Sequence, residues 1–243
     1  MIKILKTIVS YFIRLKKRVR PFLETINIFF YYLVRRKQVS IYIKNNQTRK
    51  LQIGTGTNVM EGWLNSDLYP RKGMIYLNAT KPLPFPNQSF DYIYSEHMIE
   101  HISFQDGYKF LEDSFRILRA GGKIRIATPN LSFYLKLFST NKTPEQKEYM
   151  EWMYSNWIKK SGASFQNEAF ILNLVQHAWG HVFIYDFVTL KSVLEKIGFD
   201  SIKQFECQIS EDINLKDLEK HGEHTGNVAM NHLETLVVEA KKG

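Results

Sequence analysis

A glycine-containing turn is the clearest candidate ligand-binding segment in the chain. Residues 51–56 read LQIGTG, an apolar strand that runs into a G-x-G turn. Glycine has no Cβ and tolerates positive φ, so Gly54 and Gly56 would let the backbone approach a ligand closely. The third glycine of a dinucleotide-binding fingerprint is missing, since Asn58 and Val59 occupy that neighbourhood. The pattern therefore disfavours a pyrophosphate as the ligand.

An aspartate near the end of the next predicted strand, residues 63–68, is the second candidate. The carboxylate of Asp67 could accept two hydrogen bonds from a ribose diol, which every nucleoside cofactor offers. Asp67 follows Gly56 more closely than the roughly 20 residues typical of NAD-binding folds. A nucleoside other than NAD is the better prediction, and a solvated turn aspartate is the alternative.

Two groups of histidines could support acid–base or metal chemistry. His97 and His101 are four residues apart, which predicts a shared helix face with Glu100 beside them. No metal site is predicted there, because the H-E-x-x-H order is absent and the spacing supplies no third ligand.

The second group, His177 and His181, follows an aromatic-rich stretch. Histidine can remove a hydroxyl proton near neutral pH, so His181 is predicted as the general base. His97 and His177 are the other catalytic candidates. The alternative is that His181 caps the loop before the helix predicted at 187–197.

Alternating strands and helices from residue 50 onward would position these residues. The pattern predicts a Rossmann-like α/β fold, with a doubly wound, mostly parallel, seven-stranded sheet whose ligand site lies at the carboxyl ends of the strands. A turn is predicted at 120–122. The predicted strands are 50–53, 63–68, 74–77, 90–95, 123–127, 201–207 and 234–240, and the predicted helices include 104–118 and 187–197.

Two segments extend this pattern. Residues 131–186 are rich in aromatic side chains and are predicted to be an inserted helical region that either lines an acceptor pocket or forms a hydrophobic subdomain core. Residues 1–47 are predicted to be a basic, amphipathic helical arm that Pro21 interrupts. The remaining domain then spans residues 48–243.

The arm accounts for the whole net charge of +9, and Glu24 is the single acidic residue among residues 1–50. Ile4, Ile8, Phe12 and Leu15 recur at helical spacing between basic residues. The arm could therefore pack on the domain, pair in a homodimer, or bind an anionic membrane surface through residues 1–40.

Other features limit the partners and the compartment. The apolar run 26–34 is far shorter than the roughly 20 residues that span a bilayer. No nucleic-acid recognition motif accompanies the basic charge, so a nucleic-acid partner is not expected. Cys207 is the lone cysteine, which fits a cytoplasmic protein, peripheral at the inner face of the membrane if the arm binds lipid.

The order of four sequence pieces resembles class I S-adenosylmethionine (SAM)-dependent methyltransferases, of the predicted type found with bacterial surface-polysaccharide genes. The pieces are IGTG followed by GWLNSDL, then TKPLPFPNQSFDYIYSEHMIEH, then FLEDSFRILRAGGKIRIATPN, over about 80 residues. The C-terminal HGEHTGNVAMNHLETLVVEAKK also resembles the ending of such proteins. The arm lies outside the resemblance.

The resemblance implies SAM as the cofactor and gives roles to individual residues. Gly54 and Gly56 would pass beneath the methionine part, and Asp67 would bind the ribose hydroxyls. Asn78 would lie near the adenine, where family members usually carry Asp. Glu96 and His97 would border the cofactor and the acceptor. The implied cofactor contacts are Gly54, Thr55, Gly56, Asp67, Leu68, Asn78, Ala79, Glu96 and His97.

The implied activity is methyl transfer to an oxygen or nitrogen of a small-molecule, saccharide or glycolipid-precursor acceptor. The alternative is a catalytically inactive SAM-binding scaffold in a membrane-bound complex. A nucleotide-dependent oxidoreductase is disfavoured by the missing third glycine, and RNA methylation by the absence of an RNA-binding module.

Overall fold

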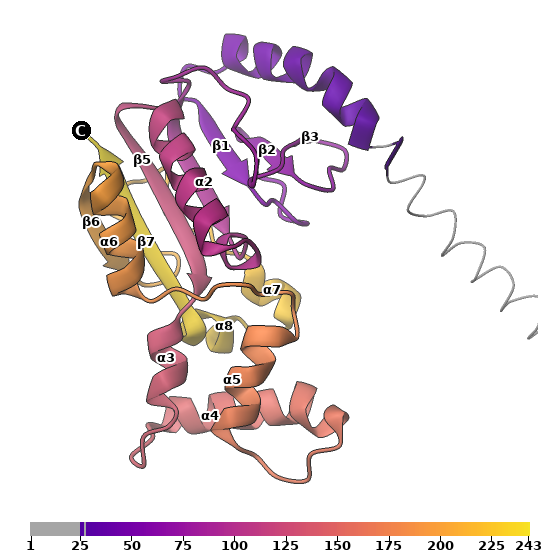
Figure 1. The fold of residues 1–243 in the computed structure, drawn as a ribbon, viewed down its shortest axis with the longest axis vertical. Coiled ribbons are helices and arrows are strands. Elements are labelled where there is room, and N and C mark those ends of the chain that lie inside the picture. Colours follow the sequence, from indigo (N-terminus) through magenta and orange to yellow (C-terminus); the bar gives the residue numbers. More distant parts are fainter. Residues whose placement is uncertain (1–24, 27) are drawn as a thin grey trace, which may run out of the picture.

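The computed structural model describes residues 25, 26 and 28–243 and contains one seven-stranded sheet (Figure 1). Its strand order is β3-β2-β1-β4-β5-β7-β6, and only β7 runs antiparallel to its neighbours. This confirms the Rossmann-like, mostly parallel sheet. The strands are β1 (Lys50–Ile53), β2 (Leu64–Asp67), β3 (Met74–Tyr76), β4 (Phe90–Glu96), β5 (Leu118–Pro129), β6 (Phe199–Phe205) and β7 (Thr235–Lys242).

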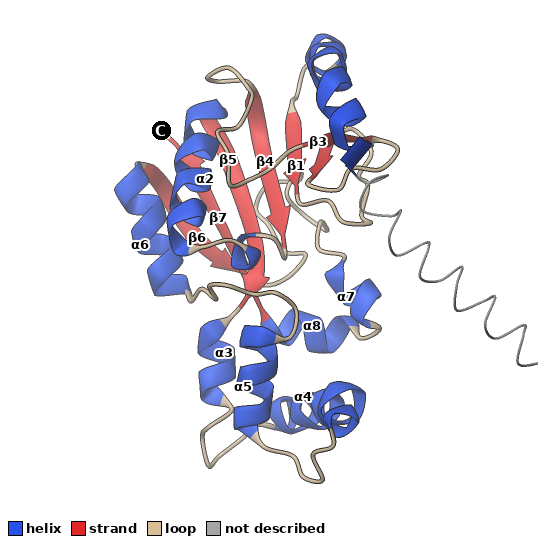
Figure 2. Ribbon diagram, turned by 45° about the vertical axis from the view of Figure 1, so that its right-hand side comes forward, coloured by secondary structure: helices blue, strands red, loops and turns tan. Residues whose placement is uncertain are grey.

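The helices lie around the sheet and below its carboxyl ends, as Figure 2 shows. Both α2 and α6 lie where helical periodicity predicts them. Ser103 caps α2 by accepting the Asp106 N–H, and Gly198, with φ of 110°, ends α6. The labelled helices are α2 (Phe104–Ile117), α3 (Leu131–Lys136), α4 (Pro144–Met153), α5 (Glu168–His177), α6 (Phe187–Ile197), α7 (His221–Thr225) and α8 (Val228–Glu234).

The two faces of the sheet are covered differently. On one face, Leu51, Ile93 and Ile124 join the main hydrophobic core, which also contains the apolar sides of α2 and α6. On the other, Trp63 and Tyr94 pack against Leu215 from an irregular segment, 206–220. Burial of both faces explains why strand residues of either side are buried, polar ones such as Gln52, Asn65 and Arg125 included.

The aromatic insertion forms a hydrophobic core of its own. Tyr134, Tyr149, Met153 and Ile171 of α3, α4 and α5 pack together, and Met230 of α8 joins them. The helices predicted for 131–186 are present, and they stand below the carboxyl ends of the strands (Figure 2). The insertion therefore serves as a packed subdomain that faces the ligand-binding edge of the sheet.

The separate turn predicted at 120–122 is wrong. These residues lie inside β5, which starts at Leu118, and the pairing of β5 with β4 shifts register between Phe90 and Tyr92. Gly121 has φ of 77°, and a Cβ at Gly122 would lie 3.0 Å from the carbonyl oxygen of Asp91. The glycines thus permit an irregularity within the strand, without ending it.

A helix over residues 28–45 lies at the β3 side of the sheet. Tyr42 anchors it by donating to Lys50 O and Gly62 O, both at 2.9 Å, while Arg35 donates to Tyr76 O. The predictions for Pro21 and for the apolar residues at positions 4 to 15 lie outside the described residues. Within the described part of the chain, no helix is long and apolar enough to cross a bilayer.

Candidate active site

A cavity of about 560 Å³ lies between the carboxyl ends of β1 and β4 and the helical insertion. Its position agrees with the rule that ligands of open α/β sheets bind at the carboxyl ends of the strands. Its volume falls within the roughly 300–1,000 Å³ of ligand pockets. The lining residues include Gln52, Gly54, Thr55, Gly56, Glu96, His97, His101, Tyr134, Trp152, Trp157, Trp179, His181, His221, His224 and Glu234.

The G-x-G turn forms one wall of the cavity. Gly54 has φ of 76°, and a Cβ there would lie 2.7 Å from Cβ of Met98, so both conformation and space require glycine. Gly56 has φ of 57° and no atom within 4 Å of the position that a Cβ would take. The Thr55 hydroxyl is buried and accepts the Ser66 N–H at 3.1 Å. The backbone of Gly56 is therefore open to a ligand, whereas the side chain of Thr55 holds the turn to β2.

Asp67 ends β2 and is bonded to the same turn. Its Oδ2 accepts the Gly56 N–H at 2.8 Å, and its Oδ1 accepts the Tyr69 N–H at 2.8 Å. Each carboxylate oxygen retains a further lone pair, which could accept a ribose hydroxyl. Asp67 is not part of the cavity wall described above, but it contacts Gly56, which is.

The predicted adenine-side residues lie apart from the cavity wall. Asn78 folds back on its own turn, where its Oδ1 accepts both the N–H and the hydroxyl of Thr80, at 2.9 and 2.8 Å. Ala79 packs against the main core, and Leu68 is exposed. None of the three lines the cavity. Their role as cofactor contacts stays a prediction.

Glu96 connects the end of β4 to the C-terminal half of the chain. Its Oε1 accepts the N–H groups of Lys220 and His221, at 2.9 and 2.8 Å. Burial raises the pKa of Glu96, although these two N–H groups oppose the effect. Glu96 therefore borders the cavity as predicted, and it also fixes the position where α7 begins.

His97 and His101 do not share a helix face, so that expectation is wrong. His97 has φ of 45° and precedes the short 3₁₀ turn Ile99–His101. Its Nδ1 lies 3.1 Å from Glu100 Oε1, and its ring stacks on His221 at 3.8 Å. Burial opposes protonation, but the contact with Glu100 and its charge outweigh burial and raise the pKa of His97. His97 is thus held by Glu100 on one side and by the ring of His221 on the other, which makes it a weak candidate for general base.

His181 is the best placed of the predicted bases. It lines the cavity, and its Nδ1 lies 2.5 Å from the carbonyl oxygen of Val175, to which it must donate. Burial lowers the pKa of His181. The N-cap of α6 itself is Asp186, which accepts the Thr189 N–H, and the alternative role of His181 in the loop before this helix stays a prediction. His177, at the exposed end of α5, does not line the cavity.

Several cavity residues carry no local sequence signal. Glu234, just before β7, accepts hydrogen bonds from the hydroxyls of Tyr134 (2.7 Å) and Tyr149, which link the insertion to the sheet. Burial and the charge of Glu234 raise the pKa of both tyrosines well above the usual value, so they remain donors. Trp157 meets Trp152 and Trp179 edge-on, with centroid distances of 4.7 and 5.8 Å. The aromatic composition predicted such a wall, but nothing in the sequence pointed to Glu234.

His221 supports a prediction about acid stability. Burial, together with the charge of His97, lowers the pKa of His221 to about 3, whereas an unfolded histidine titrates near 6.5. Below about pH 6.5 the unfolded chain therefore binds a proton that the folded chain does not, and stability falls with pH. We expect this side chain to contribute a loss of about 1 kcal/mol per pH unit, after allowance for its partial exposure.

Urea unfolding of wild type and His221→Asn between pH 6.5 and 4.5 measures this contribution. The variant should lose stability less steeply with falling pH. His232→Asn, a histidine away from the cavity wall, should keep the wild-type slope. Identical slopes in all three proteins would contradict the prediction.

Comparison with known proteins finds a family match in the central part of the chain. Residues 51–126 match the family model described as a methyltransferase domain. The matched range runs from β1 into β5 and includes the G-x-G turn, Asp67, Glu96 and His97. No curated protein matches the chain.

Solved structures of similar shape include several methyltransferases at low identity. A SAM-dependent methyltransferase from Thermotoga maritima is 15% identical, with 92% of this chain and 97% of that chain covered and a TM-score of 0.48. One from Archaeoglobus fulgidus is 16% identical, with 96% and 100% covered and a TM-score of 0.45. A third is Haemonchus contortus phosphoethanolamine N-methyltransferase 2, in complex with phosphomonomethylethanolamine and S-adenosylhomocysteine. It is 16% identical, with 85% of this chain and 53% of that chain covered and a TM-score of 0.45.

The cavity has groups that fit a nucleoside cofactor with a charged amino-acid end. Gly56 leaves open space where a side chain would stand, and the Asp67 carboxylate is bonded to its N–H. Gln52 Oε1, a buried acceptor in the cavity wall, has no hydrogen-bond partner among the described residues. Residues 51–126 match a methyltransferase domain, and S-adenosylmethionine, the cofactor that this match implies, fits these groups.

Proposed function

We propose that the chain transfers a methyl group from SAM to an oxygen or nitrogen of a small-molecule acceptor, with a saccharide or glycolipid precursor as the first candidate. The observation that carries the proposal is one continuous cavity, bounded by the G-x-G turn on the sheet side and by the tryptophans of the insertion on the other. Such a cavity has room for the cofactor and the acceptor side by side. Flat aromatic walls suit the apolar faces of sugar rings.

The roles of the residues follow from their positions. Gly54 and Gly56 would hold the methionine part of SAM, and Asp67 the ribose hydroxyls. SAM supplies the methyl group on a sulfonium, so the protein needs mainly to orient the acceptor and exclude water. His181 donates its Nδ1–H to Val175, which leaves the Nε2 lone pair free to accept a proton from the acceptor. Glu96 and His97 line the cavity and would lie between the cofactor and the acceptor.

Calorimetry and an activity assay test this proposal together. We expect S-adenosylhomocysteine (SAH) and SAM to bind and NAD not to bind. Saccharide and lipid-linked saccharide acceptors, with small amines as the comparison class, should give SAH formation and a methylated product by mass spectrometry. His181→Asn should lower turnover without changing SAH affinity. Binding of SAH without turnover on any acceptor class would favour the inactive scaffold, and binding of NAD alone would contradict the family.

Asn78 offers a test of the adenine side of the site. The amide oxygen of Asn78 has only two lone pairs, and both are used by Thr80. An aspartate could keep the bonds to Thr80 on one oxygen and offer the other to the adenine amino group. We expect Asn78→Asp to strengthen SAH binding roughly threefold to tenfold, as the net gain of one ordinary hydrogen bond allows. Unchanged affinity, measured by calorimetry, would place the adenine elsewhere.

We also propose that the N-terminal region holds the protein at an anionic membrane surface, which would bring it to a lipid-linked acceptor. In the helix over 28–45, Phe29, Phe30 and Leu33 are 61, 58 and 60% exposed. The exposed basic residues Arg36 and Lys37 follow in the same helix. Exposed aromatic side chains beside basic ones are typical of interfacial helices. The predicted homodimer would use the same surface.

Vesicle sedimentation tests this surface on the full chain. We expect binding to vesicles that contain phosphatidylserine, and at least tenfold weaker binding when Phe29, Phe30 and Leu33 are replaced by Glu. Replacing Val188 and Ile213 by Glu is the matched control, because both are exposed apolar residues on other parts of the surface. Equal vesicle binding by all three proteins would contradict membrane contact, and a change in molar mass by light scattering would point to the dimer.

A further inference from the structure

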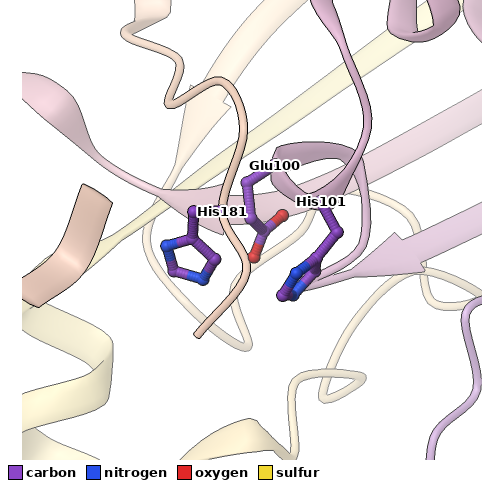
Figure 3. A group of neighbouring side chains, drawn as sticks. All are labelled: Glu100, His101 and His181. Atoms are coloured by element: carbon purple, nitrogen blue, oxygen red, sulfur yellow. The ribbon is translucent and has the colours of Figure 1, made fainter. Parts of the chain in front are cut away.

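Three side chains from distant parts of the sequence meet at the cavity. Glu100 and His101 lie in the 3₁₀ turn after β4, and His181 lies in the loop between α5 and α6. One ligand atom from each residue lies within 4.8 Å of the others (Figure 3). Figure 3 shows the Glu100 carboxylate between the two imidazole rings. His101 and His181 line the cavity.

The carboxylate of Glu100 is buried and incompletely bonded. Its side chain is fully buried, and Oε2 accepts the Thr128 hydroxyl at 3.0 Å. Oε1 lies 3.1 Å from His97 Nδ1 but has no partner that meets hydrogen-bond geometry. The carboxylate is thus ion-paired with His97 on one side only, and a cation that binds it from the cavity side would satisfy it further.

Both histidines are oriented as metal-binding histidines usually are. Nδ1 of His181 lies 2.5 Å from Val175 O, and Nδ1 of His101 lies 3.3 Å from Gly180 O. Since a carbonyl can only accept, each Nδ1 carries the hydrogen and each Nε2 keeps a lone pair. A backbone carbonyl that fixes the tautomer in this way is the common support of a histidine ligand.

The backbone holds the two halves of the cluster together. The N–H groups of Val182 and Phe183 donate to the carbonyl oxygen of Glu100, at 2.7 and 3.2 Å. The loop that carries His181 is thereby fixed beside the turn that carries Glu100 and His101. These backbone hydrogen bonds keep the loop and the turn together even without contact between the side chains of Glu100, His101 and His181.

We propose that Glu100, His101 and His181 bind one divalent transition-metal ion, with Zn²⁺ as the first candidate. Two imidazoles and one carboxylate are a ligand set of catalytic zinc sites, which keep a further position open. Mg²⁺ and Ca²⁺ prefer all-oxygen sites and are not expected. Bonds of about 2.1 Å place tetrahedral ligands roughly 3.4 Å apart, so the ligand atoms must move closer together. His101, whose side chain is exposed, is free to turn inward.

The open position of the ion would face the cavity, because two of the three ligands line it. An acceptor hydroxyl bound there would lose its proton to solvent more readily, since the cation stabilises the alkoxide. In the metal-loaded protein the Nε2 lone pair of His181 would bind the ion and could not accept a proton. The ion would then activate the acceptor hydroxyl in place of His181. This consequence rests on the proposed methyl transfer; the metal site does not.

Metal binding is measured on the full chain, without an affinity tag and after treatment with a chelator. We expect one Zn²⁺ per chain by calorimetry, Co²⁺ binding with visible d–d absorption bands, and no binding of Mg²⁺. His101→Asn and His181→Asn should each weaken Zn²⁺ binding at least tenfold and abolish the Co²⁺ bands. His232→Asn, the matched control away from the cavity, should bind both ions as wild type does.

Readouts besides metal affinity keep the result interpretable. His101→Asn changes an exposed side chain, so its circular dichroism spectrum and its melting temperature without metal should equal those of wild type. Glu100→Gln is a less specific test, because the buried carboxylate of Glu100 also contacts His97 and its loss would disturb that pair. Absence of Zn²⁺ binding by a wild-type protein that binds SAH would overturn the metal site and leave the proposed function intact. Equal Zn²⁺ affinity in His101→Asn, His181→Asn and wild type would also overturn it.

Discussion

Replacing Arg125 with methionine is expected to lower the free energy of unfolding by about 3–5 kcal/mol. Arg125 lies in β5 with a fully buried side chain, and its guanidinium forms two hydrogen bonds with Glu219, at 2.7 and 2.9 Å. A further hydrogen bond goes to Glu239 of β7. Methionine would leave both carboxylates buried without a cation. Urea unfolding followed by circular dichroism measures the loss.

Arg119 provides a matched control in the same strand. It binds Asp91 at 2.9 Å, but the two side chains are 34 and 26% exposed, so the ion pair is partly solvated. Arg119→Met should therefore cost about 1 kcal/mol or less. Adding Glu219→Gln and Glu239→Gln to Arg125→Met should recover part of the stability, because the unpaired charges are removed. Equal losses for Arg119→Met and Arg125→Met would show that burial of the pair contributes little.

The same buried group also positions the cavity rim. Glu219 directly precedes Lys220 and His221, whose N–H groups bind Glu96 at the end of β4. Arg125 additionally donates to the carbonyl oxygen of Ile209, at 2.9 Å, within the irregular segment that covers the second sheet face. We expect the destabilised variant to hold α7 less firmly against the cavity.

Local sequence patterns predicted the strands and helices that are determined by residues close together in the sequence. The strands 50–53, 74–77 and 90–95 were placed to within one residue, because apolar runs between turn residues are what a sheet buried on both faces requires. The helix 187–197 was placed because its apolar periodicity lies between Asp186, a capping residue, and Gly198. The start of β5 was missed, because glycines that usually mark a turn here permit a register shift.

Contacts between distant residues were beyond this reasoning. The spacing of His97 and His101 predicted a shared helix face, but the chain takes a left-handed conformation at His97 and turns the two rings apart. His181 joins His101 through the fold alone, and Glu234 enters the cavity wall from the end of α8, just before the last strand. Such partners follow from how the insertion packs against the sheet, and one sequence does not encode that packing in any periodic pattern.

Asp67→Ala is expected to weaken SAH binding by about 1.5–3 kcal/mol, since the ribose would lose a charge-assisted hydrogen bond. This corresponds to roughly a tenfold to 150-fold rise in the dissociation constant. The Gly56 N–H would also lose its partner, which loosens the turn that faces the cofactor. Asp67→Asn should lie between wild type and Asp67→Ala, because one oxygen can still accept the Gly56 N–H.

The substitution Asp91→Ala is the control that distinguishes a loss of cofactor binding from a loss of folding stability. Like Asp67, Asp91 accepts a backbone N–H, from Arg49 at 2.7 Å, but it is not part of the cavity wall. Asp91→Ala should therefore lower the melting temperature without changing SAH affinity by calorimetry. If Asp67→Ala also left the affinity unchanged, the ribose would bind away from β2. An equal loss of affinity in both variants would instead reflect general destabilisation, so the assignment of Asp67 depends on the difference between them.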